Sequence, residues 1–239
     1  METFLLIFVM SLGAAFVQRV SGFGFGIFIM TVLPFLLPSY GEATALSGLL
    51  ALVTSLFITL RLRRFIPWRR LLPILTTFLV VSAMAVLAVA SAPESLLKRI
   101  LGVVLIAASI WFFCFSGRVQ VRPTPGVQVS LGTLSGLMGG FFGMQGPPAV
   151  LYFIATTKSK EEYMAMAQCY FLVGNVFMTL VRAHAGFLTS TVCRCWLYGI
   201  LGVAIGAWVG AIVYRRIPLP ILRRIIYLYM AASGVVMLL

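Results

Sequence analysis

The chain carries the stretch Ser21-Gly-Phe-Gly-Phe-Gly26 and a counterpart, Gly139-Gly-Phe-Phe-Gly-Met-Gln-Gly-Pro-Pro148. The first stretch interrupts a run, Phe4 to Leu37, that is apolar apart from Gln18, Arg19 and a few hydroxyls. As one helix this run would be about 51 Å long, against a hydrocarbon core of roughly 30 Å. The sequence therefore predicts helices that break at the glycines, with the freed backbone groups packed in protein or lining a cavity.

The composition is that of a membrane protein. Of the 239 residues, 62% are hydrophobic and 10% are charged, and the mean hydropathy is +1.09. A soluble domain needs a more polar surface than this composition supplies. The apolar runs are long and continuous, which indicates membrane helices and excludes the alternating strands of a β-barrel. The expected fold class is an all-α polytopic membrane protein.

The apolar segments form two similar halves. The first five lie at 4–19, 27–38, 42–60, 71–91 and 98–116, and five more lie at 128–142, 147–157, 162–181, 191–214 and 221–239. The motif Leu52-Val-x-x-x-Phe57-x-Thr59-Leu60 recurs 120 residues later as Leu172-Val-x-x-x-Phe177-x-Thr179-Leu180. With the same offset Gly26 falls on Gly146 and Glu42 falls on Glu162. A duplication is the expected origin, with repeats at 1–117 and 128–239 and a cytoplasmic linker at 118–127.

The distribution of cations between the loops indicates how each broken segment crosses the membrane. The formal net charge is +13, and the cations lie in short loops between apolar segments, which is typical of orientation signals and argues against nucleic acid as the partner. A single interrupted crossing would divide the loop cations equally between the two faces. A hairpin that returns to its starting side instead collects thirteen on one face: Arg61, Arg63, Arg64, Arg69, Arg70, Arg118, Arg122, Lys158, Lys160, Arg215, Arg216, Arg223 and Arg224. The positive-inside rule therefore favours hairpins.

A hairpin followed by three crossings inverts the second half relative to the first. The expected architecture is two inverted-topology repeats, each a glycine-broken helix hairpin plus three transmembrane helices, with both termini outside. Transporters of this design bind substrate near the midplane, between discontinuous helices. Whether each hairpin spans fully or is re-entrant stays open, because both have the same parity.

The glycine stretches and the polar residues beside them form the expected substrate site. A helix that begins after a break points unpaired N–H groups and its positive dipole end into the break, where an anion can bind. We expect such helices to begin at Ile27 and at Pro147. Close packing of small residues, snorkelling of the arginine and interhelical hydrogen bonds are the alternatives. The candidate substrate-binding residues are Gln18, Arg19, Ser21, Gly22, Gly24, Gly26, Ser47, Ser55, Gly143, Gln145, Gly146, Gln168 and Asn175.

Few other residues offer chemistry. Arg182 and His184 end a helix and are expected to anchor it at the outer interface. All five acids lie at helix ends or in loops, so no carboxylate is available inside the membrane as a proton relay or cation ligand. A lone histidine without ligands at suitable spacing predicts no metal site. No catalytic constellation and no cofactor are expected, which leaves a small anion as the natural cargo.

The two glycine stretches, the first followed by Pro34 and the second by Ala155-Thr-Thr-Lys-Ser-Lys, resemble those of the sulfite exporter TauE/SafE family, also called the toluene sulfonate uptake permease family. The first stretch differs in having Arg19 and no Gly-Gly doublet. The resemblance implies secondary transport of sulfite or organosulfonates such as sulfoacetate across the bacterial inner membrane. The alternatives are a transporter or channel for other small organic anions, and a non-transporting scaffold. The expected partners are a small anion and the lipid bilayer, and a homodimer stays open.

Overall fold

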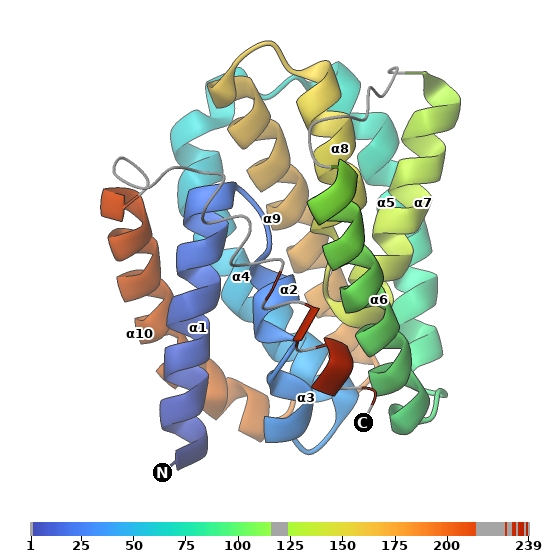
Figure 1. Ribbon diagram of the computed structural model, residues 1–239. Coiled ribbons are helices and arrows are strands. Elements are labelled where there is room, and N and C mark those ends of the chain that lie inside the picture. The colour runs from blue at the N-terminus through green and yellow to red at the C-terminus, as the bar shows by residue number, and fades with distance from the viewer. Residues whose placement is uncertain are drawn as a thin grey trace.

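The computed structural model describes residues 2–115 and 124–213, together with 228, 231–232, 234–236 and 238. Most of the predicted linker and of the last predicted segment, with the cations at 118, 122 and 215–224, therefore lies outside the described residues. Every element in the described part is helical, and the helices form one bundle (Figure 1). The elements are α1 (Glu2–Ser21), α2 (Phe25–Ile29), α3 (Leu33–Leu36), α4 (Tyr40–Leu62), η1 (Arg63–Phe65), α5 (Trp68–Val89), α6 (Glu94–Phe115), α7 (Pro125–Phe142), α8 (Gly146–Thr156), α9 (Lys160–His184) and α10 (Ser190–Val213).

Five of the described helices are long and apolar enough to cross a membrane by length and composition. They are α1, α4 with η1, α5, α9 and α10, and each has at least 20 residues, or about 30 Å of helix. The prediction of an all-helical protein is confirmed for this part of the chain, and five of its helices are candidate membrane spans.

Both glycine stretches turn the chain back on itself. In Figure 1 the chain rises along α1 and returns through α2 and α3 to the end of the bundle where α4 begins. The second hairpin starts at the opposite end, descends along α7 and returns through α8 to the start of α9. At 11 residues, α8 is only about 16 Å long, so this return limb covers about half of the hydrocarbon core.

The two helices that follow the hairpins begin with the same cap. The Ser39 hydroxyl accepts the backbone N–H of Glu42 at 3.2 Å, and the Ser159 hydroxyl accepts that of Glu162 at 3.1 Å. Ser-x-x-Glu is a helix-start signature, because the serine oxygen satisfies one of the first unpaired N–H groups. The equivalent caps lie 120 residues apart, the same offset that relates the sequence motifs.

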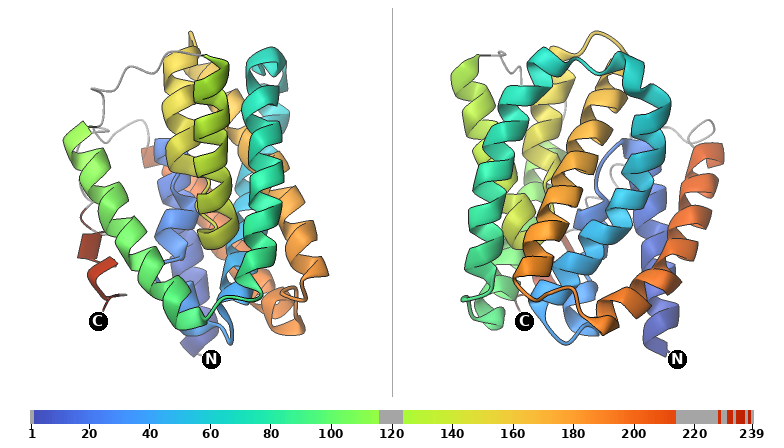
Figure 2. Two further views of the ribbon diagram at one scale, coloured as in Figure 1. Left: turned by 90° about the vertical axis from the view of Figure 1, so that its right-hand side faces the viewer. Right: turned by 180° about the vertical axis from the view of Figure 1, so that it is seen from behind.

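Three helix pairs form the bundle: α1 with α10, α5 with α7, and α4 with α9. Helices α4 and α9 lie side by side in the centre of the bundle, as the view from behind in Figure 2 shows. The first two pairs approach closely because glycines at four-residue spacing face the partner helix. These are Gly132, Gly136 and Gly140 of α7 against α5, and Gly202, Gly206 and Gly210 of α10 against α1.

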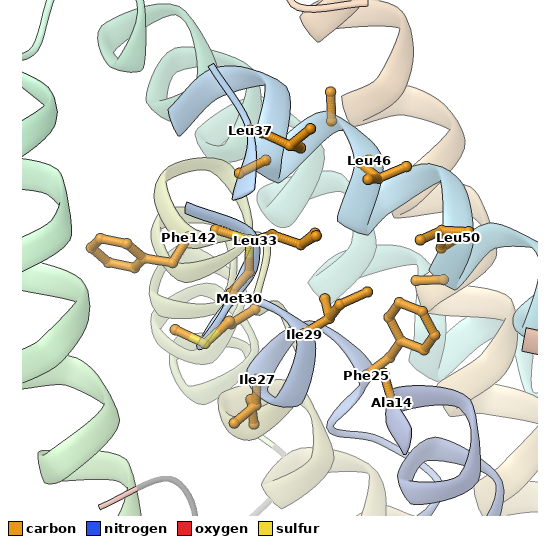
Figure 3. Packing of buried hydrophobic residues seen from close by; sticks show 14 of the residues in the cluster. Ala14, Phe25, Ile27, Ile29, Met30, Leu33, Leu37, Leu46, Leu50 and Phe142 are labelled. Carbon is orange, nitrogen blue, oxygen red and sulfur yellow. The ribbon is translucent and has the colours of Figure 1, made fainter. Parts of the chain in front are cut away.

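Apolar packing fixes the first hairpin against α4. Figure 3 shows Phe25, Ile29 and Leu33 gathered beside Leu46 and Leu50 of α4. All five side chains are buried. A second buried cluster joins α5, α8 and α9 around Phe78, Phe153 and Tyr170, and it fixes the second hairpin. The backbone of each break is therefore held in place by apolar contacts on either side.

Candidate anion site between the two helix breaks

The two glycine breaks meet in the centre of the bundle. A Cβ atom added to Gly26 would overlap the carbonyl oxygen of Gly143 and would lie 3.5 Å from the Cα of Met144. Likewise, a Cβ on Gly146 would lie 3.4 Å from the side chain of Phe23. The backbones of the two breaks are therefore in direct contact.

Glycine is required by the backbone at both breaks. Gly24 precedes α2 with φ +97°, and Gly143 follows α7 with φ +67°. Both angles lie in the left-handed region, which costs other L-residues about 1–2 kcal/mol. The Gly143 N–H donates to the Gly139 carbonyl at 3.0 Å, which ends α7 at the break.

A small cavity lies between the breaks. Its volume is about 30 Å³, which is room for about two water molecules. Every lining side chain is uncharged. The lining residues are Gln18, Phe23, Gly24, Phe25, Gly26, Ile27, Ala51, Gly143, Met144, Gln145, Gly146, Phe171 and Asn175.

The lining thus includes seven of the thirteen candidate residues, drawn from both halves of the chain. They are Gln18, Gly24, Gly26, Gly143, Gln145, Gly146 and Asn175.

Asn175 is the lining residue best placed to donate to a ligand. It lies on α9, is 4% exposed, and its carboxamide has no hydrogen-bond partner among the described residues. A buried amide without partners is costly unless a ligand or water satisfies it. The Asn175 amide is therefore available to a bound molecule.

Gln18 is fixed by a chain of hydrogen bonds that crosses between the halves. Its Nε2 donates to Ser55 Oγ at 3.2 Å and to Gln168 Oε1 at 3.1 Å, and Gln168 Nε2 donates to the Gly22 carbonyl at 2.8 Å. The Oε1 of Gln18 is buried and has no hydrogen-bond partner in the described part of the chain. Ser55, Gln168 and Gly22 thus position Gln18 without lining the cavity themselves.

The second break is fixed by residues that the sequence analysis did not single out. Tyr170 donates its hydroxyl proton to Ser135 Oγ at 2.8 Å, and Ser135 donates to the Gln145 backbone carbonyl. All three side chains are buried. A serine inside the glycine-rich helix α7 was the only signal for this chain of bonds.

The remaining three candidates lie beside the cavity or away from it. Ser47 Oγ would be 3.5 Å from a Cβ on Gly143 and is buried without a partner. The Ser21 hydroxyl donates to the Val17 carbonyl at 2.8 Å, within its own helix. Arg19 is half-buried and lies against Gly210 of α10, so its charge is not at the cavity.

Both helices after the breaks begin earlier than predicted. The first begins at Phe25 and not at Ile27, and it has only five residues. The second begins at Gly146, which puts Pro147 at the second helical position. Since Pro147 and Pro148 have no N–H, Gly146 is the only residue of the first three that can donate from the end of α8. Side-chain amides therefore carry a larger share of any hydrogen bonding to a ligand than the sequence analysis assigned to them.

The prediction that Arg182 anchors its helix at the interface is wrong. Arg182 lies on α9, is 1% exposed, and its guanidinium packs against α4 and α7. Its Nη2 donates to the carbonyls of Gly139 and Gly140, at 3.0 and 3.4 Å. Packing of three helices, and not its position near a helix end, determines its environment.

The chain matches the family model described as Sulfite exporter TauE/SafE over residues 7–237. It belongs to this family. It is also 27% identical over 214 residues to the "Probable sulfite/organosulfonate exporter TauE" of Cupriavidus necator, a match that covers 87% of this chain and 82% of that protein. No solved structure matches the chain. Family membership indicates a membrane transporter, in agreement with the apolar helices.

Proposed function

We propose that the protein is a secondary transporter of small sulfur-containing anions, such as sulfite or sulfoacetate, which bind between the two helix breaks. The cavity where the breaks meet carries this proposal, because its lining contains the Asn175 amide and the first N–H of α8 and contains no acidic side chain. The relative in C. necator is named for sulfite and organosulfonate export. A scaffold would need no polar cavity at this depth.

The proposed donors lie in the second half, where the Asn175 amide and the Gly146 N–H donate to the anion. The Nε2 groups of Gln18 and Gln145 already donate to Ser55, Gln168 and Phe171, so these two side chains hold the lining of the cavity in place. Gly24, Gly26 and Gly143 keep side chains out of the space, which lets the ligand approach the backbone. A cavity of about 30 Å³ fits a compact oxyanion only after slight widening, as alternating access requires.

The inverted repeat is proposed on the pairing of the helices. If the halves are exchanged, α1 replaces α7 and α10 replaces α5, so the α1–α10 pair becomes the α5–α7 pair. The α4–α9 pair maps onto itself. This pattern, the equivalent serine caps and the opposed hairpins support two repeats, 1–117 and 128–239, joined by a linker at 118–127. One repeat could then rock against the other around the site.

The orientation follows from the arginine-rich end of the bundle. Arg70 pairs with Glu162 at 2.9 Å and donates to the Thr156 carbonyl at 2.8 Å, which brings the loop at 61–70 and the loop at 157–160 to the same end. The hairpin arrangement predicts this proximity. The positive-inside rule assigns that end to the cytoplasm, with the N-terminus outside the bacterial inner membrane. Cysteines at Ser39 and Lys158 should therefore be labelled from opposite faces, and labelling from one face would contradict the repeat.

Flux in proteoliposomes tests the function. Wild-type protein should transport sulfite or sulfoacetate with saturation, and neither taurine, which carries an ammonium group, nor an organic cation of similar size should compete as strongly. Transport of the cation alone would refute the anion proposal. Flux that rises linearly with concentration would indicate a channel instead.

A further inference from the structure

Arg182 carries a buried charge that the protein satisfies only in part. Its Nη2 donates to two carbonyls, while Nε and Nη1 have no hydrogen-bond partner among the described residues. Three of the five guanidinium N–H donors are therefore unused. At 1% exposure they are not reached by bulk water.

An arginine in this state lacks a counterion. The carbonyls of Gly139 and Gly140 lie at the negative end of α7 and offset part of the charge. No carboxylate among the described residues lies within ion-pair distance of Arg182. The one ion pair among these residues joins Arg70 and Glu162, at the arginine-rich end of the bundle. Since an unpaired buried cation is strongly unfavourable, an anion from outside the chain would stabilise Arg182.

Two hydroxyl groups near the guanidinium have no hydrogen-bond partner among the described residues. The backbone of Gly48 packs closely against the free side of the guanidinium: a Cβ on it would lie 3.1 Å from Arg182 Nη1, 3.6 Å from Thr179 Oγ1 and 3.9 Å from Asn175 Oδ1. Thr179 Oγ1 and the Tyr40 hydroxyl are both buried without partners, and Tyr40 is within electrostatic range of Arg182. A guanidinium edge with nearby hydroxyl donors matches the oxygens of a compact oxyanion.

Asn175 connects this side of Arg182 with the central cavity, whose lining includes Asn175. Asn175, Thr179 and Arg182 follow one another at spacings of four and three residues, so they share one face of α9. Arg182 lies about 10 Å from Asn175 along the helix axis, away from the arginine-rich end. Tyr40 and Ser47 are seven residues apart in α4, so they share one face of that helix. One track of polar groups thus runs from the cavity to Arg182.

We propose that Arg182, Thr179 and Tyr40 form a second anion-binding station, separate from the central cavity and on its outer side. Its ligand is the transported oxyanion, an identity that rests on the proposed function. The station supplies the positive charge that the uncharged cavity lacks, and it draws anions to the track. Because Arg182 also holds the carbonyls just before Gly143, binding there acts on the second break directly.

Equilibrium binding of radiolabelled sulfite to the purified full chain tests the station. Wild type should bind two anions per chain. At about 10 Å and an effective dielectric constant of about 20, their repulsion weakens the second step roughly 10- to 20-fold, so the two steps separate in the titration. Arg182→Gln should bind one anion.

Thr179→Glu retains Arg182 and its bonds to α7 but supplies an internal carboxylate, so it should also bind one anion and should unfold at or above the wild-type temperature. The matched control is Arg19→Gln, which removes a charge that lies against α10 and does not line the cavity, and it should bind two.

The outcomes separate this station from the proposed function. If wild type binds one sulfite and both Arg182→Gln and Thr179→Glu retain it, the station is refuted while sulfite binding in the cavity stands. If wild type binds one sulfite that both variants lose, the station stands and the cavity site fails. If wild type binds no sulfite, the station is refuted as a substrate site, and proteoliposome flux decides the function independently.

Discussion

Replacing Gly26 with alanine places one methyl group between the two helix breaks. The new Cβ would overlap the Gly143 carbonyl oxygen and would lie 3.1 Å from its carbonyl carbon, whereas favourable carbon–carbon contacts begin at about 3.5 Å. Both partners are backbone atoms, so no side-chain rotation relieves the clash. Overpacking of this kind costs about 1–3 kcal/mol, and the upper end applies because the hairpins themselves must separate.

The expected result is a folded protein with little transport. A loss of about 3 kcal/mol lowers the unfolding temperature by roughly 6–12 °C in a chain of this size. Separation of the breaks also displaces the groups that line the cavity between them, so sulfite flux per folded molecule should fall at least tenfold. Gly126→Ala is the matched control, since nothing lies within 4 Å of its Cβ position. Wild-type flux and stability in Gly26→Ala would refute the contact between the breaks.

Three further substitutions test individual residues. Asn175→Leu should lower flux about 10- to 100-fold, the value of a hydrogen bond to a charged group, and should leave the yield of folded protein nearly unchanged; an equal loss of both would mark Asn175 as a packing residue. Gly143→Ala should destabilise by about 1–2 kcal/mol in thermal unfolding because its φ is +67°, and an unchanged unfolding temperature would argue against that backbone. Arg70→Ala should lower the free energy of unfolding by less than about 1 kcal/mol and leave flux per molecule unchanged, because the paired side chains of Arg70 and Glu162 are 39% and 19% exposed. A large loss of flux would instead place this end of the bundle on the transport path.

The positions of the breaks could be predicted because they follow from length. A run too long for one crossing must be interrupted, and glycine marks where. That argument also predicted that the breaks come together, since buried backbone groups need a common polar environment. The helix starts at Phe25 and Gly146 were each missed by one or two residues, because a single turn after a break depends on local packing.

The choice between neighbouring polar residues could not be predicted. Gln18 and Arg19 are adjacent, so they point about 100° apart around α1 and cannot both face the cavity. Gln18 does so and Arg19 lies against α10. Since α1 is apolar on most of its surface, its sequence does not indicate which face is turned inward.

Arg182 was misread for a related reason. A cation near a helix end usually reaches the interface, and hydropathy contains no information on neighbouring helices. Its burial depends on the close approach of α4 at Gly48 and on the carbonyls at the end of α7, which are distant in sequence. Only the packed structure brings these groups together.

A structure of the full chain determined with bound sulfoacetate tests the central claim most directly. The account predicts ligand density between the two breaks, with a sulfonate or carboxylate oxygen within hydrogen-bond distance of the Asn175 amide and the Gly146 N–H. An empty cavity in the presence of saturating ligand, with density only on the surface of the bundle, would contradict it.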